Sequence, residues 1–311
     1  MTTQHNVPTS DDYDHLLSPL TPTEADHLVR LAMTALADHG VLTCYLHDEG
    51  TLLVTSATDS GLGIEGAVFG LTNLARTISA EPSQQWRPLV EHHFDCLLAR
   101  VERPPGAPPD PERELYLRLI ARASVPGELS AGIPEFLPGL IAVPASNQNG
   151  TYALHFQPES FGLTWTEAHR IALTNLNQFT DTVSIVERDG VELAVLGDSS
   201  WAASRALVLD TVLRESLQVE NPRYGVLVAL PARHLLVIHV IRDLAVLPAL
   251  SAMLHLTHEA FESAPGPLTR SIYLVDQSGW HPATTSPADH PLRHHLAPHF
   301  RSLTQTLAGL E

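Results

Sequence analysis

The chain has 311 residues, 44% apolar and 17% charged, so it is long enough for roughly two domains of about 150 residues and apolar enough to bury a core. Its formal net charge is −17 with histidine neutral, and no cluster of basic residues interrupts that acidity, which excludes nucleic acid as an expected partner. Cys44 and Cys96 are the only cysteines, which excludes a disulfide framework and a cysteine-rich zinc site.

No segment has the pattern of an export signal or a membrane span. Residues 1–18 are polar and acidic, without a charged stretch followed by an apolar one. The longest apolar runs, 224–230 and 235–241, have the length of strands and are too short to cross a bilayer. We therefore expect a cytoplasmic protein that is not associated with a membrane.

Residues 1–20 are expected to form a flexible arm, and a helix is predicted to begin directly after them. Thr21 can cap this helix, Pro22 suits its first position, and Glu24 can return a hydrogen bond to the cap. Apolar residues then recur with a 3.6-residue period until Gly40, which favours a helix end. The other elements expected in this N-terminal subdomain, 21–101, are a hairpin of 41–47 and 51–56 and helices at 65–79 and 84–99.

A proline-rich stretch at 102–112 predicts a stiff linker, because proline fixes φ and removes backbone donors. In the C-terminal subdomain, 113–284, Thr164 and Glu167 form a second capping box, and Asp189-Gly190 predicts a two-residue hairpin turn. A histidine-rich tail with a terminal helix is expected at 285–311. The predicted elements are helices at 113–122, from 165, at 200–217 and at 245–262, and strands at 139–144, 151–157, 181–187, 191–196, 224–230, 235–241, 271–275 and 279–283.

The order of these elements predicts an α+β fold in two subdomains. The strands at 224–230 and 235–241 are apolar on both faces, which is typical of central strands covered by helices. Helices and hairpins alternate, and this favours helices packed on mostly antiparallel sheets made of hairpins. A parallel doubly wound sheet would instead show single strands between helices.

Residues 197–200, Gly-Asp-Ser-Ser, resemble the nucleophile block of the Gly-Asp-Ser lipases. A serine nucleophile needs a histidine base held by a carboxylate. That family places its block near the N-terminus and a catalytic Asp-x-x-His near the C-terminus, and no Asp-x-x-His follows here. Asp198 and the serines are also good caps for the helix expected at 200–217, and we favour that role.

His255, His258 and Glu262 share one face of the helix expected at 245–262 and are the candidate metal ligands. Zinc sites on helices use the order His-Glu-x-x-His, which differs from the order here. A solvated helix flank accounts for the same spacing. We therefore expect no metal and no other cofactor at these residues.

The tail contains two further histidine pairs, His290 with His294 and His295 with His299, each four residues apart. Pro298 lies inside the second pair and breaks its helical spacing. We expect the tail to bind metal only adventitiously.

Arg233, His234 and His239 are the candidate contacts for a ligand or partner. Arg233 and His234 lie in the turn between the strands at 224–230 and 235–241, where they could contact a ligand. His239 lies in an otherwise apolar run, and we expect its ring to donate to a backbone carbonyl because buried polar groups must be satisfied. No residue is predicted to be catalytic.

Three groups of residues together resemble a conserved family of bacterial cytoplasmic proteins with close relatives in high-GC actinobacteria and no assigned activity. The resemblance spans 65–285 and implies one continuous architecture across the linker, without a catalytic residue. The groups are 70–75 (GLTNLA) with 86–94 (WRPLVEHHF), 162–176 (GLTWTEAHRIALTNL) and 225–239 (GVLVALPARHLLVIH).

The leading functional hypothesis is a non-catalytic interaction or regulatory protein that binds another protein, of basic character, through an acidic surface. The order of helices and hairpins in the second half resembles small acidic secretion chaperones, which implies a chaperone-like binding role. The alternative is a hydrolase or metal-dependent enzyme. An apolar groove without converging polar groups favours the first hypothesis, and a pocket where histidine meets a carboxylate or hydroxyl favours the second.

The 18 histidines predict a net charge that changes steeply below neutral pH. Histidines at the surface gain a proton as the pH falls below neutral, so the formal charge of −17 moves toward zero. Electrophoretic mobility measured from about pH 8 down to about pH 5 should lose most of its negative magnitude. A mobility that stays flat over this range would contradict the expectation.

Overall fold

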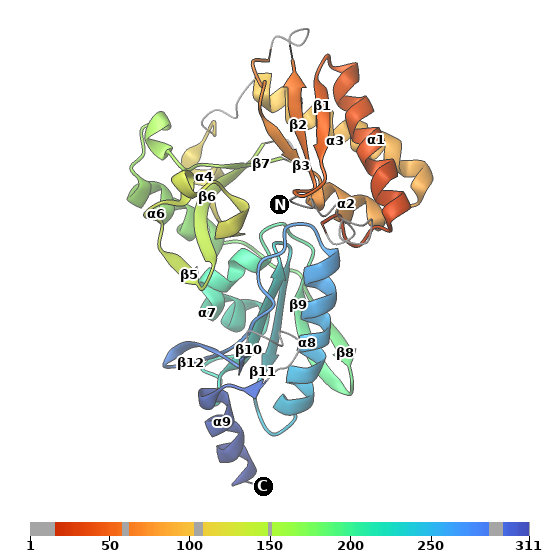
Figure 1. The fold of residues 1–311 in the computed structure, drawn as a ribbon. Coiled ribbons are helices and arrows are strands. Elements are labelled where there is room, and N and C mark those ends of the chain that lie inside the picture. Colours follow the sequence, from red (N-terminus) through yellow and green to blue (C-terminus); the bar gives the residue numbers. More distant parts are fainter. Residues whose placement is uncertain (1–15, 58–61, 103–107, 149–150, 286–294, 311) are drawn as a thin grey trace, which may run out of the picture. The chain divides into compact units, whose positions relative to one another are not determined.

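The computed structural model describes residues 16–57, 62–102, 108–148, 151–285 and 295–310, and its fold is α+β as the sequence predicts (Figure 1). Every strand pairing within these ranges is antiparallel. None of the helices described is long and apolar enough to cross a membrane.

The chain divides into two compact units. Unit 1 comprises Met1–Gly106 with Glu262–Pro265, and unit 2 comprises Ala107–Phe261 with Gly266–Glu311. The division after Gly106 falls inside the stretch predicted as a linker, of which residues 103–107 lie outside the described part of the chain.

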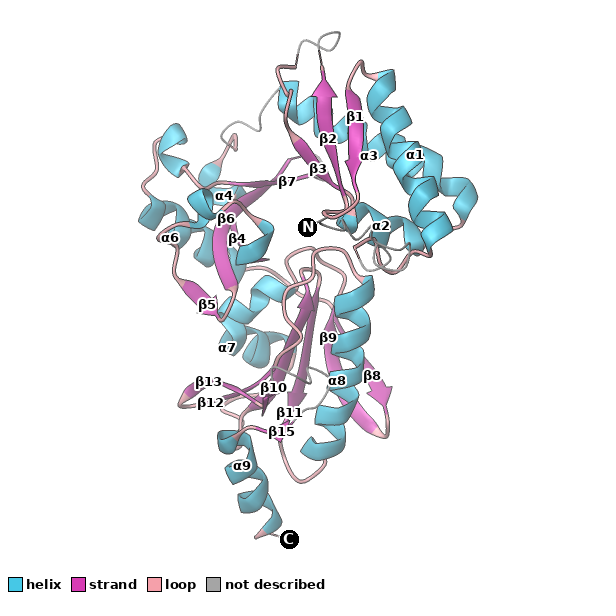
Figure 2. Cartoon of the chain, viewed as in Figure 1, coloured by secondary structure: helices cyan, strands magenta, loops and turns pink. Residues whose placement is uncertain are grey.

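Unit 1 packs helices on a three-stranded sheet of order β1-β2-β3 (Figure 2). Its first helix, α1 (Pro22–Asp38), begins with the predicted capping box, in which Thr21 and Glu24 bond each other's backbone N–H. Gly40 follows the helix with a left-handed φ of 73°, which confirms the predicted helix end. The remaining elements are β1 (Leu42–Leu46), β2 (Thr51–Ser56), β3 (Val68–Gly70), α2 (Thr72–Ser79) and α3 (Trp86–Glu102).

Two expectations for unit 1 are wrong at their boundaries. The helix predicted at 65–79 begins only at Thr72, because β3 pairs with β2 as the third strand of the sheet. The predicted arm, 1–20, is described from residue 16, and there Leu17 and Leu20 are buried in the core of the unit. Burial of these two apolar side chains holds the end of the arm on the folded unit.

Unit 2 is built on a six-stranded sheet of order β13-β12-β10-β11-β9-β8. Strands β10 (Val226–Ala232) and β11 (Leu235–Val240) are central in it, as their two apolar faces predict. The turn between β8 and β9 has φ values of 54° at Asp189 and 77° at Gly190, which fits the predicted two-residue hairpin turn. The outer strands are β8 (Val183–Arg188), β9 (Val191–Leu196), β12 (Ile272–Asp276) and β13 (Gly279–Pro282).

Helical segments cover both faces of this sheet. Leu227 and Ala229 of β10 face one core, which α8 (Val246–Ser263) and α9 (Pro298–Ala308) complete. Val228, on the opposite face, packs in a second core with the segment at 203–216. Near α9, β14 (Thr284–Thr285) pairs with β15 (His295–Leu296).

The segment predicted as one helix at 200–217 is instead a series of different helical turns. The amide N–H of Ala203 donates to the carbonyl of Arg233 at 3.3 Å, so it leaves the regular helical pattern at the start of the segment. The turns are a 3₁₀ helix (Ala203–Val208), α7 (Leu209–Thr211) and a π-helical turn (Val212–Ser216).

A second sheet of unit 2 has the order β4-β6-β5, with β7 paired to β6. Helix α6 (Trp165–Asn177) packs against it and begins with the predicted capping box of Thr164 and Glu167. The elements of this region are α4 (Pro111–Glu114), β4 (Tyr116–Ala121), α5 (Gly127–Ser130), β5 (Glu135–Leu137), β6 (Leu140–Gln148) and β7 (Thr151–Leu154).

The helix predicted at 113–122 is wrong, because most of this stretch is strand β4. All six residues of β4 pair with β6, and Leu117 and Leu119 are fully buried. The amide N–H of Leu119 donates to the hydroxyl of Ser204 at 2.9 Å. The pairing with β6 on one edge of β4 and the bond to Ser204 on the other edge hold the backbone of β4 in an extended conformation.

Unit 2 also contains a fully buried ion pair between Arg205 and Asp181, which are 1% and 3% exposed. Nε of Arg205 donates to both carboxylate oxygens at 2.9 Å, Nη2 lies 2.8 Å from Oδ2, and Nη1 donates to the carbonyl of Leu176. The hydroxyl of Ser216 donates to the same carboxylate at 3.0 Å. This guanidinium is buried together with a negative charge and a full set of acceptors, which is the condition under which proteins tolerate a buried cation.

Candidate anion-binding site

Arg118 is a second buried arginine of unit 2, and its surroundings differ from those of Arg205. It is 3% exposed and lies on β4 between Leu117 and Leu119. Because side chains alternate along a strand, Arg118 points to the face opposite these two leucines. Its Nη1 atom is buried and has no hydrogen-bond partner.

Aromatic rings surround the guanidinium of Arg118. Its central carbon lies 4.1 Å from the ring centre of Tyr152 and 5.4 Å from that of Trp201. Trp201 is 5% exposed and also contacts the rings of Tyr116 and Tyr152, each at 5.2 Å between centres. Cation–π contacts of this kind contribute about 0.5–2 kcal/mol each.

The turn between β10 and β11 carries a second cation, Arg233, whose charge acts on Arg118. Its amide N–H donates to the carbonyl of Gly266 at 2.9 Å, and its carbonyl accepts from Ala203. Arg233 is partly buried, and burial lowers its pKa. Burial also lowers the pKa of the neighbouring His234, and the charge of Arg233 adds to this effect, so His234 is neutral at pH 7.

The charges of the two arginines act on each other without a carboxylate to balance them. The pKa of Arg118 is lowered to about 10, mainly by burial and then by the charge of Arg233, while the charge interaction and the hydrogen bond with Tyr152 act in the opposite direction. Arg118 therefore remains a cation at pH 7. No carboxylate in the described part of the chain forms an ion pair with Arg118 or Arg233.

The free-energy cost of burying Arg118 without a counter-charge is larger than the stabilisation that its aromatic contacts return. Burying one cation without a partner costs several kcal/mol, whereas the two rings around Arg118 return about 1–4 kcal/mol together. The like charge of Arg233 increases the cost. An anion bound between the two guanidinium groups would supply both the charge and an acceptor for the unpaired Nη1.

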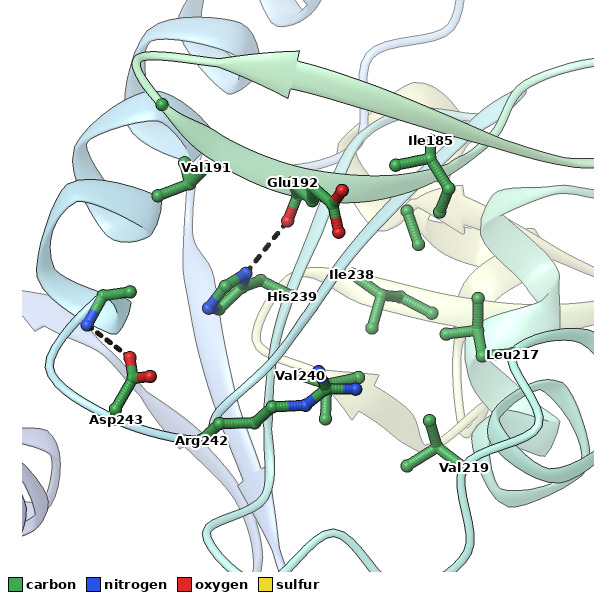
Figure 3. A pocket seen from close by; sticks show the side chains of 13 residues that line it. Ile185, Val191, Glu192, Leu217, Val219, Ile238, His239, Val240, Arg242 and Asp243 are labelled. Carbon is green, nitrogen blue, oxygen red and sulfur yellow. Dashed lines mark hydrogen bonds between the residues drawn. The ribbon is translucent and has the colours of Figure 1, made fainter.

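His239 does not belong to this site. It lies on the wall of a separate cavity of about 320 Å³, where its Nδ1 donates to the carbonyl of Glu192 at 3.1 Å (Figure 3). The expected bond to a backbone carbonyl is therefore present. The residues that line this cavity include no serine, threonine, cysteine or tyrosine, so no side-chain hydroxyl or thiol of its wall stands beside His239.

The predicted capping of a helix by residues 197–200 is wrong, because the 3₁₀ helix that begins at Ala203 has no side-chain cap. The hydroxyl of Ser199 accepts from the amide N–H of Trp201 at 3.0 Å, which holds the start of the segment that carries Trp201. A cavity of about 160 Å³ beside Gly197 and Asp198 is lined without a histidine. A serine nucleophile has no base there.

The candidate metal ligands on α8 do not form a cluster. His255 and His258 are exposed, and no group of three potential ligands forms around them or Glu262 within the described residues. Glu259 of the same helix pairs with Arg188 at 2.8 Å. The helix flank is thus solvated, as the alternative interpretation of the spacing predicts.

An apolar cavity of about 630 Å³ lies between α6 and the second sheet of unit 2. Phe136, Trp165 and Leu173 are among the side chains of its wall. Glu135, also on the wall, is bound to the side chain of Arg122 and to the amide N–H of Gly139. Burial lowers the pKa of His169, and no hydroxyl–histidine or carboxylate–histidine hydrogen bond forms among the lining residues.

Sequence reasoning identified Arg233 and missed Arg118, Tyr152 and Trp201. Arg118 was missed because its stretch was interpreted as a helix. The signal was nevertheless present, since Leu115, Leu117 and Leu119 alternate with a period of two, which is typical of a strand. An arginine inside such a strand predicts either a buried ion pair or a ligand.

Gly266 supplies a test of the position of Arg233. A Cβ at Gly266 would lie 2.6 Å from Cδ of Arg233, and the φ of Gly266 is +68°. Gly266→Ala should therefore destabilise unit 2 by about 1–2 kcal/mol through its φ, with a further loss from the displaced arginine.

Gly132 is the matched control, because it has a φ of +78° and no atom within 4 Å of its Cβ position. Urea unfolding of both alanine variants separates the two effects. Equal losses in Gly132→Ala and Gly266→Ala would contradict the close contact with Arg233.

Comparison of the chain with protein families, with curated proteins and with solved structures finds no match in any of the three. The function is therefore inferred from the geometry of unit 2. The feature of that geometry that points most directly to a ligand is the pair of guanidinium groups at Arg118 and Arg233.

Proposed function

We propose that the protein is a non-catalytic regulatory protein that binds a small oxyanion through Arg118 and Arg233 of unit 2. The observation that carries this proposal is the buried, unpartnered Nη1 of Arg118 beside a second arginine. Elsewhere in the same unit, burial of Arg205 is accompanied by burial of Asp181. A bound anion would have the same role for Arg118 that Asp181 has for Arg205.

The chemistry of the two arginines defines the ligand class. A guanidinium presents its N–H donors in a planar fork that matches the oxygens of a carboxylate or a phosphate. Two such groups favour a ligand with at least two anionic oxygens. The formal charge of −17 on the protein disfavours the approach of an anion. Anion binding would therefore depend on the local positive charge of the two arginines.

The walls of three cavities support binding over catalysis at those places. Among the residues that line the cavities at His239, at Gly197 and beside α6, no hydrogen bond joins a hydroxyl or a carboxylate to a histidine side chain. The acidic character of the chain would make a protein partner basic. Under this proposal, occupancy of the Arg118 site would alter how that partner is bound.

The proposal predicts saturable stabilisation by oxyanions. In a buffer without oxyanions, phosphate or citrate should raise the melting temperature of the untagged protein. A ligand at 100 times its Kd stabilises by about 2.7 kcal/mol. Arg118→Met and Arg233→Met should abolish this gain, since each removes one of the two cations.

Arg214→Met is the matched control, because Arg214 lies in unit 2 and its side chain is 52% exposed in a surface pair with Glu215. This variant should retain the full response. Multivalent salts also stabilise proteins non-specifically. An equal response in all three variants and in the unaltered protein would therefore refute the proposed site, as would the absence of any response in the unaltered protein.

A further inference from the structure

Three potential metal ligands converge at the edge of the main sheet of unit 2, and one of them, His299, belongs to a histidine pair noted in the sequence. They are Asp276 at the end of β12, His281 on β13 and His299 in the first turn of α9. One ligand atom from each lies within 4.8 Å of the other two. Strand pairing and the packing of α9 on the sheet bring them together.

The nitrogen atoms of both imidazoles face the same carboxylate. Nε2 of His299 lies 2.7 Å from Oδ2 of Asp276, and Nε2 of His281 lies 3.9 Å from Oδ1. The two imidazole rings stack with their centres 4.1 Å apart. Tetrahedral zinc with bonds of about 2.0–2.1 Å requires ligand atoms roughly 3.3 Å apart, a spacing between the two distances observed here.

Ser278 orients the carboxylate. Its amide N–H and its hydroxyl both donate to Oδ1 of Asp276, at 2.8 Å and 2.6 Å. These bonds leave Oδ2 directed at His299. Metal-binding carboxylates are commonly held in this way by a neighbouring donor, which fixes the oxygen that faces the ion.

The same residues do not form a serine-nucleophile triad. Nε2 of His281, 2.8 Å from the Ser278 hydroxyl, is also the ring atom nearest Asp276. In a triad, the base meets serine with one ring nitrogen and the carboxylate with the other. Here the Ser278 hydroxyl donates to Asp276 and accepts from His281, so its proton is directed at the carboxylate.

We propose that Asp276, His281 and His299 form a binding site for a divalent transition metal ion, with zinc as the best match. Two imidazoles and one carboxylate suit zinc and its neighbours, whereas magnesium and calcium prefer oxygen ligands alone. Three protein ligands leave a fourth position for water or a further ligand.

The site is open to an incoming ion. The side chains of Asp276, His281 and His299 are 27%, 31% and 44% exposed. The ligands are therefore rigidly placed by β12, β13 and α9 while remaining accessible from solvent. The formal charge of −17 on the chain also favours the approach of a cation.

Zinc titration of the full-length protein by calorimetry tests this site, with the affinity tag removed and the protein first treated with a chelator. We expect one zinc ion per chain bound at this site. His281→Ala and His299→Ala should each weaken that binding roughly tenfold or more, and Ser278→Ala should weaken it about 10–100-fold by releasing Asp276.

The double variant His255→Ala, His258→Ala is the matched control, because it removes two exposed histidines of α8 and should leave the affinity unchanged. Circular dichroism and thermal unfolding without metal verify that each variant is folded. If His299→Ala does not fold, His299→Gln replaces it. Absence of zinc binding, or zinc binding that the Ser278, His281 and His299 variants retain in full, overturns the proposal.

Discussion

A guanidinium removed from water requires a negative charge beside it, and among the described residues of unit 2 one of the two buried arginines meets this requirement. Arg205 has Asp181, with three contacts of 2.8–2.9 Å and a further donor on the carboxylate. Arg118 has aromatic rings and a second arginine. The difference between these two environments is the physical basis of the proposed function, because an anion is the component that Arg118 lacks.

The backbone around Arg118 is fixed by hydrogen bonds that join four separate parts of the chain. Ser204 accepts from β4 at Leu119, Ala203 donates to the turn at Arg233, and that turn donates to Gly266. These bonds hold the aromatic residue Trp201 and the two cations in place without help from a ligand. A preorganised site of this kind loses little conformational entropy on binding.

Short sequence patterns correctly predicted the elements whose structure depends on neighbouring residues. Capping boxes at Thr21 and Thr164, the turn at Asp189-Gly190 and the doubly apolar strands β10 and β11 are all present in the structure. Each of these signals depends on residues within a few positions of one another. The sequence therefore supports the α+β fold class and most of the boundaries in unit 2.

The sequence did not reveal features that depend on distant partners. Strand β4 was assigned as a helix because its identity comes from pairing with β6, and Arg118 was missed with it. His299 was considered only as a partner of His295, whereas the fold places it beside Asp276, 23 residues away. Spacing along the chain contains no information about such contacts.

The stability of two methionine variants in a buffer without oxyanions tests the central claim most directly. Arg118→Met removes an uncompensated buried charge, so its free energy of unfolding should be unchanged or higher by about 1–4 kcal/mol. Arg205→Met leaves Asp181 buried without its partner and should cost about 3–5 kcal/mol. A comparable loss of stability in both variants would contradict the account, because it would show that Arg118 is already compensated within the protein.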